Sequence, residues 1–585
     1  MRAYLIAVLA LLFTGCGGLP DFPMAPVTID GDLKVWNPIS LSFEGQIFSE
    51  EENTFRDYEL NVYFEHEDGG IIAVPGYFAA DGKAEFSGAE SGNIWRAHFV
   101  PSRSGKWFYS AYLKTGDNMV AKPPIIQGFS PIDGTEGEFI VDDAELDSSA
   151  TDFRKQGMLQ DVNARYLQFS GTKEYFLKTG AGSPENILAY SDFDGTYDVG
   201  GTHFPALGEN QLHEFEPHLK DAREGDPTWG GDEGKGAAIL GIANYYEEVG
   251  VNAQYLVTMN VEGDGQDVFP WVSHNDPYVF DVSKLAQWQR VFEHFNSRGV
   301  LIDMLLTETE NESWFEAMDG VEVGKDFAES RKLYYREIVA RFGHLNGLVF
   351  NLGEENGVVG NSGQDPYRQP TSLEQRRAFA KYIRDLDPYD HAVVSHNWPD
   401  SEEETYGALL GDPDFSGISL QAHDKYFEKI ATWTQKSKAA GRQWMVTVDE
   451  PLGWEFGARP DSENPLHERE IKEVLWPTLM AGGAGVDWYF GWQNNAATSD
   501  LSNEDQRSRH NLWVKSAKVR KFWEEHVRFW EMDSVRSSEG MAFRKPDDDH
   551  TGLVLIGDSV IYKATLQHGE KVNFRVDLDT ADFDR

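Results

Sequence analysis

The chain has 585 residues, and its 97 Asp and Glu against 52 Lys and Arg give a formal net charge of −45. Charge on this scale argues against nucleic acid as a partner, because it would repel the phosphates. The length suggests two to four domains, and the 17 Trp suit both buried cores and platforms on which sugar rings stack.

The N-terminus is typical of an export signal. An apolar stretch from residue 3 to Phe13 follows a charged start and leads to Cys16, the only cysteine; it is too short to span a membrane. The segment resembles a bacterial lipobox, although Phe13 replaces the more usual Leu. That resemblance implies cleavage before Cys16 and lipidation of its sulfur, with an ordinary secretory signal as the alternative. We therefore expect an exported protein without a disulfide, at the outer membrane or cell surface.

The signal is assigned to residues 1–16 and a Gly- and Pro-rich linker to residues 17–35. Residues 36–145 are predicted to form a β-sandwich. Within 58–64 the apolar side chains alternate, as they do in 95–99 and 107–113, which is the period of a strand with one buried face. Turn-forming residues separate these segments, and short strands at this spacing favour a sandwich.

Residues 146–532 change to an alternation of strands and helices, which predicts a parallel sheet. Eight strands are expected, and this number predicts a (β/α)₈ barrel of the α/β class. They begin near Tyr175, Gln254, Leu301, Leu348, Ala392, Gly417, Trp444 and Val486. The extra material between the first two, near 192–236, is expected to form part of a cleft wall. Residues 533–585 return to alternation and predict a small C-terminal β-domain.

Two apolar runs in this barrel stop abruptly at carboxylates: Leu348 to the Glu354-Glu355 doublet, and Trp444 to Glu450. Glu354 and Glu450 are 96 residues apart, close to three units of a barrel with about 31 residues per unit, so they fit strands 4 and 7. Opposed carboxylates are the minimal equipment for cleaving a glycosidic bond. Each run alone is more often helix N-terminal decoration, but the two together at this spacing favour catalysis.

The other predicted strands also end in polar or aromatic residues, as a sugar site requires. The predicted substrate contacts are His396, Asn397, His423, Trp454 and Trp488. Two Asp pairs, 192/194 and 264/267, have a calcium-loop character without the full pattern of a calcium loop. Structural calcium is therefore an alternative, and neither a cofactor nor a catalytic metal is predicted.

Several motifs resemble a bacterial family of provisionally assigned polysaccharide-degrading enzymes, and the resemblance covers nearly the whole mature chain. The motifs are Trp36-Asn-Pro38, Val74-Pro-Gly76, Gly105-Lys-Trp107, Leu177-Lys-Thr-Gly-Ala-Gly-Ser-Pro-Glu-Asn186 and Asn351-Leu-Gly-Glu-Glu-Asn356. The family joins an N-terminal domain of unknown function to a clan-A-like glycoside hydrolase barrel and a C-terminal domain of the collagen-binding type.

The resemblance implies that Glu354 is the acid/base and Glu450 the nucleophile, since clan A places these after strands 4 and 7. One departure leaves Glu355 as an alternative acid/base: clan A has Asn directly before this residue, where this chain has Gly353.

The first hypothesis is a retaining glycoside hydrolase anchored at the cell surface. The predicted substrate is a marine algal galactan, on the basis of the family resemblance and the acidic composition. The alternative is a non-catalytic glycan-binding lipoprotein that uses the same cleft and the two β-domains. Both hypotheses expect a polysaccharide or oligosaccharide partner and membrane contact through the lipid anchor only. An adhesin for host protein would rest on the name of the C-terminal domain alone.

Overall fold

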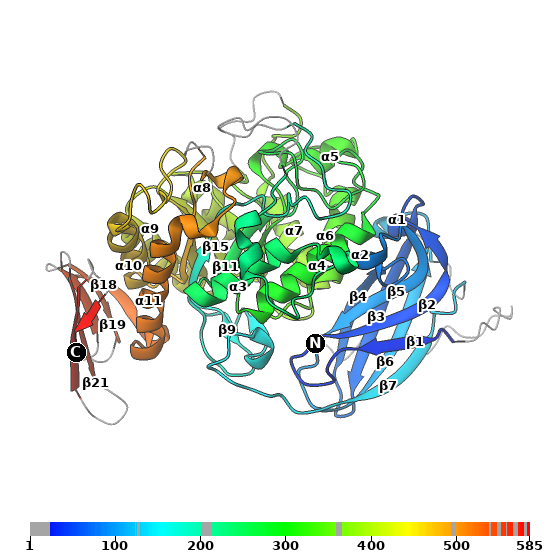
Figure 1. The fold of residues 1–585 in the computed structure, drawn as a ribbon, viewed down its shortest axis with the longest axis horizontal. Helices are drawn as coiled ribbons and strands as arrows, with labels where there is room; N and C mark the ends of the chain where they lie inside the picture. Colours follow the sequence, from blue (N-terminus) through cyan, green and yellow to red (C-terminus); the bar gives the residue numbers. More distant parts are fainter. Residues whose placement is uncertain are drawn as a thin grey trace.

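Three β-sheet systems follow one another along the chain, with a barrel between two antiparallel domains (Figure 1). The computed structural model describes residues 24–546 except 123, 126–128, 201–211, 358–364, 493–497 and 538–539, and then the backbone of 552–556, 559–565, 571–577 and 582–584. The predicted signal and Cys16 lie outside these residues. Among the helices that are described, none combines the length and apolarity needed to cross a membrane.

The N-terminal domain has seven antiparallel strands in the order β1-β2-β5-β4-β3-β6-β7. Phe64 of β3 stacks on Phe99 of β5 with 4.0 Å between ring centroids. Because these strands are not hydrogen-bonded neighbours, the sheet folds over at β4 and buries its apolar faces as a sandwich. The strands are β1 Val27–Asp30, β2 Ile39–Ser49, β3 Tyr58–His66, β4 Ile71–Phe78, β5 Ser91–Phe99, β6 Gly105–Thr115 and β7 Thr135–Val141.

Strand β1 lies within residues 17–35, which the sequence predicts to be a linker. It pairs with β2 from Val27 opposite Phe43 to Asp30 opposite Ser40. Four residues with two apolar side chains give too weak a pattern to distinguish an edge strand from a linker. Short helices α1 (Thr54–Asp57) and α2 (Ala84–Ser87) complete this domain.

Eight parallel strands close into a barrel, as predicted. They are β10 Lys178–Ala181, β11 Ala253–Val257, β12 Leu301–Leu305, β13 Leu348–Asn351, β14 Ala392–His396, β15 Gly417–Ala422, β16 Met445–Pro451 and β17 Gly485–Trp488. Every residue of these strands is buried, as expected for a parallel sheet covered by helices on the outside and by its own side chains inside. A hairpin of β8 (Leu159–Gln160) and β9 (Gln168–Phe169) precedes the barrel.

The helices around the barrel are α3 Ala237–Val249, α4 Val282–Ser297, α5 Trp314–Met318, α6 Glu329–Phe342, α7 Leu373–Leu386, α8 Glu402–Tyr406, α9 Tyr426–Ala439, α10 Trp476–Met480 and α11 His510–His526. Helix α7 begins at a conventional signal, because Ser372 and Gln375 form a capping box there. Helix α6 lies between barrel and sandwich, where Arg341 donates to the Phe78 carbonyl at 3.0 Å. This hydrogen bond is one of several contacts between the two domains; Arg336 of the same helix donates to the Tyr58 carbonyl at 3.3 Å.

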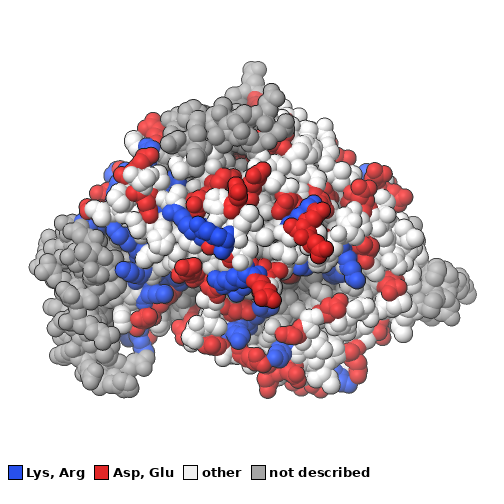
Figure 2. Space-filling view, in the orientation of Figure 1, with Lys and Arg blue, Asp and Glu red and all other residues white. Residues whose placement is uncertain are grey.

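The C-terminal domain is an antiparallel sheet of six strands in sequential order. They are β18 Asp533–Ser537, β19 Gly540–Arg544, β20 Gly552–Ile556, β21 Ser559–Thr565, β22 Lys571–Asp577 and β23 Asp582–Asp584. Arg165 joins this sheet to the barrel, because its guanidinium pairs with Asp533 at 3.3 Å and lies over the ring of Phe543. Over the face shown in Figure 2, acidic side chains are spread widely and Lys and Arg are interspersed among them.

Candidate active site

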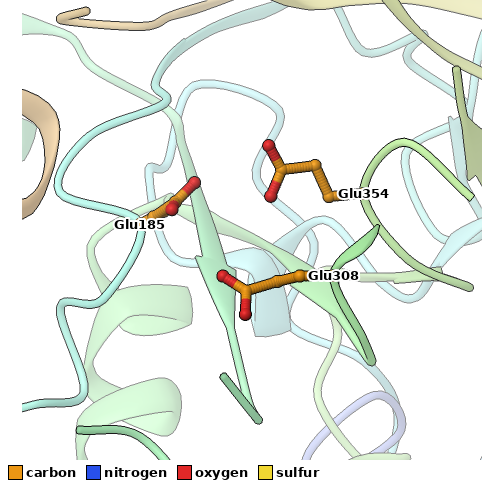
Figure 3. Close-up of side chains that lie close together, drawn as sticks. All are labelled: Glu185, Glu308 and Glu354. Atoms are coloured by element: carbon orange, nitrogen blue, oxygen red, sulfur yellow. The ribbon is translucent and has the colours of Figure 1, made fainter. Parts of the chain in front are cut away.

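Carboxylates from several strands meet at the carboxyl end of the barrel. Glu354 comes three residues after β13, the fourth strand, and Glu450 lies near the end of β16, the seventh. Oxygens of Glu354, Glu355 and Glu450 all lie within 4.8 Å of one another. A second group, Glu185, Glu308 and Glu354, meets the same limit, and its carboxylates converge on one space (Figure 3).

The turn after β13 explains why Gly353 stands before the doublet. A Cβ at this position would lie 2.2 Å from both Asn356 Oδ1 and Thr307 Oγ1, so no larger residue fits without rearrangement. Glu355 follows with a positive φ of 50°, and its backbone N–H donates to His396 Nδ1 at 3.0 Å. The packing of this turn therefore requires Gly353 at the position where the clan A pattern has Asn.

Two neutral donors hold the carboxylate of Glu450. Gln421 Nε2 donates to Oε2 at 2.6 Å, and the hydroxyl of Tyr255 lies 3.5 Å from Oε1. These residues come from β15 and β11, on different sides of the barrel. Donors directed at both oxygens favour the ionised form of Glu450 and fix its orientation.

Burial and mutual repulsion raise the pKa values of the facing carboxyls. Burial raises the pKa of Glu354 to about 8, and burial and the charge of Glu354 raise the pKa of Glu450 well above its ordinary value. A hydrogen bond between the two carboxyls lowers the pKa of Glu354 and raises that of Glu450, so the pair titrates as one coupled unit. The donors Gln421 and Tyr255 act in the opposite sense on Glu450, because they stabilise its ionised form.

Further acidic side chains next to Glu354 and Glu450 also have raised pKa values. Glu185 belongs to the 177–186 motif, and its backbone N–H donates to Asp500 Oδ1 at 3.4 Å. Burial raises the pKa of Asp500 to about 7, and burial and nearby carboxylates raise the pKa of Glu185 and of Glu308 well above their ordinary values. Protonated carboxyls in this cleft can donate hydrogen bonds as well as accept them, which suits hydroxyl-rich ligands.

The predicted substrate contacts divide into two groups. His396 is buried below the doublet, and its Nε2 has no hydrogen-bond partner among the described residues. His423 is partly exposed, its Nε2 likewise has no partner within the described part of the chain, and burial lowers its pKa. Trp454, in the loop after β16, is 46% exposed. Of these three side chains Trp454 is open to a ligand, whereas the unpartnered Nε2 atoms of His396 and His423 are buried.

Asn397 and Trp488 differ from these three residues because protein groups satisfy their polar side-chain atoms. Both are fully buried. The amide of Asn397 is saturated by Tyr406, Trp398 and Gln421, and the indole of Trp488 donates to Ser516 Oγ on α11 at 3.0 Å. The structure does not bring these two side chains to the carboxylates, because Asn397 braces the strand ends and Trp488 points outward from β17.

Other residues of the site were not selected from the sequence. Glu308 and Gln421 stand at predicted strand ends, which is a usable signal, whereas Tyr255 lies inside β11 and Asp500 begins a short 3₁₀ helix, Asp500–Ser502. Tyr489 follows β17, and burial together with the charges of Asp500 and Glu450 raises its pKa.

The calcium-like Asp pairs accept hydrogen bonds from protein groups. Asp192 accepts from Tyr190 and the Gly236 amide, and Asp267 accepts from two asparagines. In the described ranges, the acidic groups close enough to share an ion are Glu185/Glu308/Glu354, Glu354/Glu355/Glu450 and Asp303/Asp449/Asp487. None of them includes the calcium-like residues.

A solved bacterial structure is similar to this chain over most of its length. It comes from Bacteroides vulgatus ATCC 8482 and is provisionally described as a glycoside hydrolase; the match has a TM-score of 0.57 at 15% identity and covers 94% of this chain and 91% of that one. An endo-β-1,4-mannanase from Thermotoga petrophila matches with a TM-score of 0.34 at 13% identity, over 58% of this chain and 88% of that one. A pullulanase from Anoxybacillus sp. LM18-11 matches with a TM-score of 0.35 at 11% identity, over 97% and 85%.

Residues 32–114 match a family described as a domain of unknown function, DUF5060. No curated protein sequence matches the chain. At these identities the B. vulgatus structure establishes a common fold, namely an N-terminal β-domain joined to an eight-stranded barrel.

Proposed function

We propose that this protein is a retaining glycoside hydrolase with Glu354 as acid/base and Glu450 as nucleophile. The observation that carries the proposal is the meeting of these carboxylates from strands 4 and 7, with oxygens within 4.8 Å. Retaining enzymes hold the two carboxyls about 5–5.5 Å apart, whereas inverting enzymes leave about 6.5–9.5 Å for a water. The short separation supports direct attack.

In this mechanism Glu450 attacks the anomeric carbon while Glu354 gives its proton to the departing glycosidic oxygen. The resulting glycosyl ester is cleaved by a water that Glu354, now ionised, deprotonates, and Glu450 leaves as carboxylate. The donors on Glu450 support this division, since the nucleophile must begin ionised and the acid protonated.

Glu355 is the competing acid/base, because it lies in the same 4.8 Å group. Two contacts favour Glu354. The side chain of Glu355 is engaged by Gln421 and its N–H by His396, which tie it to strands 5 and 6. Glu354 instead lies with its carboxylate close to those of Glu185 and Glu308 (Figure 3), and it is from there that we propose it protonates the leaving group.

The proposed substrate is an uncharged polysaccharide, with an algal galactan as the first choice, hydrolysed outside the cell by a lipid-anchored enzyme. Partly exposed Trp454 offers a ring for the apolar face of a sugar. The crowded carboxylates support an uncharged sugar at the cleavage point, because sulfate would be repelled there.

A screen of the purified protein against neutral and sulfated polysaccharides, with product sizing, tests the activity. On the substrate found, NMR before mutarotation should show a first product that retains the anomeric configuration. Glu450→Gln should lose nearly all turnover while binding persists, and Glu354→Gln should suffer most with poor leaving groups. The same leaving-group dependence in Glu355→Gln would move the acid/base to that residue. Full activity of Glu450→Gln would refute the mechanism, and binding by the wild type without turnover would favour the glycan-binding alternative.

A further inference from the structure

Four charged side chains occupy the barrel interior: Lys178, Asp303, Asp449 and Asp487. They come from β10, β12, β16 and β17. The ammonium of Lys178 lies 2.7 Å from Asp303 Oδ2, 2.7 Å from Asp449 Oδ1 and 2.8 Å from Asp487 Oδ2. Each side chain is at most 3% exposed. This interior cluster joins strands from both halves of the barrel through one cation.

The local sequence of β10 is adapted to this cluster. A Cβ at Gly180 would lie 2.0 Å from Asp487 Oδ1, so glycine is what admits the Asp487 carboxylate beside the strand. Although burial opposes the charge, the three carboxylates raise the pKa of Lys178 well above its ordinary value. The structure therefore holds Lys178 as an ammonium among its three partners.

Asp449 directly precedes Glu450 on β16, at an irregularity in the strand pairing. Leu420 pairs with Val448 and the next residue, Gln421, pairs with Glu450, so Asp449 is an extra residue in β16. Neighbouring residues of a regular strand point to opposite faces, and a bulge changes the direction of a side chain. Here the bulge lets Asp449 reach Lys178 while Glu450 still reaches Gln421 and Tyr255. Thr447 Oγ1 adds a donor to Asp449 Oδ2 at 2.8 Å.

We infer that Lys178 is a positioning residue for Glu450: by holding Asp449 inside the barrel it maintains the bulge that directs the Glu450 carboxyl toward Glu354. The expected effect on kcat rests on the proposed function, whereas the expected effect on the position of the Glu450 carboxyl does not. Asp303 provides the matched comparison, since it pairs with the same ammonium at the same distance but lies on β12, away from the bulge.

The test compares Asp449→Ala with Asp303→Ala. Each variant removes one buried carboxylate and leaves Lys178 two partners. Crystal structures should show the Glu450 carboxyl displaced by about 1 Å in Asp449→Ala and in its original place in Asp303→Ala. A displacement of that size costs on the order of 100-fold in rate. We therefore expect kcat to fall by about 100-fold in Asp449→Ala with KM within about threefold, and by far less in Asp303→Ala.

Unmoved Glu450 in Asp449→Ala, or equal losses of kcat in the two variants, would overturn the inference, because either result means that the cluster serves stability alone. If the wild type cleaves no glycan, the proposed function fails, and the two crystal structures still decide the positioning role. If Asp449→Ala does not fold, Asp449→Asn and Asp303→Asn replace the pair. They keep the side-chain volume, and the same displacement and kcat loss, smaller in size, are expected for Asp449→Asn only.

Discussion

Replacing Lys178 by Met should destabilise the barrel strongly, because it leaves three buried carboxylates without their common cation. All three lie within 2.8 Å of the ammonium and are at most 1% exposed. Removing one partner of a buried ion pair costs about 3–5 kcal/mol. For a barrel of this size, with an unfolding entropy of about 0.8 kcal/mol/K, we expect the unfolding midpoint to fall by about 4–6 °C.

Thermal unfolding followed by tryptophan fluorescence measures the change. Lys325→Met is the control, since Lys325 and its partner Glu322 are 67% and 65% exposed and solvent screens their interaction; its midpoint should not move. The deficit of Lys178→Met should shrink toward pH 5, because burial already raises the pKa of Asp303 to about 6 and protonation discharges the carboxylates. A midpoint equal to that of Lys325→Met at pH 7 would refute the reasoning.

Three further results are expected. On the substrate identified by screening, kcat/KM should fall about tenfold per pH unit above pH 8. Burial places the pKa of Glu354 at about 8, and the Glu354–Glu450 pair loses its proton there. A flat pH profile up to pH 10 would contradict this expectation. Trp454→Ala should raise KM for polysaccharide with kcat nearly unchanged, measured beside Phe456→Ala at a similarly exposed ring (46% and 52%); no change in KM would remove Trp454 from the site. Cys16→Ser should release the protein from membranes with unchanged far-ultraviolet circular dichroism, and undiminished membrane association would show that Cys16 is not the anchor.

Local pattern was enough to predict the barrel. Its strands are buried on both faces, so each is a short, mostly apolar segment of the sequence such as Leu348–Asn351, and the helices between them keep the period of 3.6 residues. The spacing of Glu354 and Glu450 then indicated strands 4 and 7, because repeated units of similar length convert sequence distance into position around the barrel. The edge strand Val27–Asp30 has too few apolar residues for the same reasoning.

Contacts between distant segments decided the rest. Asn397 and Trp488 lie at strand ends just as His396 does, yet hydrogen bonds with Tyr406 and Ser516 hold them away from the carboxylates. Bulges and turns decide which side chains at the end of a strand face the site. The periodicity of the sequence does not predict these bulges and turns.

The interior cluster shows the same limit most clearly. A single lysine after an apolar residue in β10 gives no sign that three aspartates, from strands 125 to 309 residues further along the chain, will surround its ammonium. Sequence determined which segments are strands and which strand ends carry acids, because burial and period are local properties. Only the closure of the barrel decided which acids meet each other, which meet a lysine, and which remain protonated, because proximity and desolvation arise from packing.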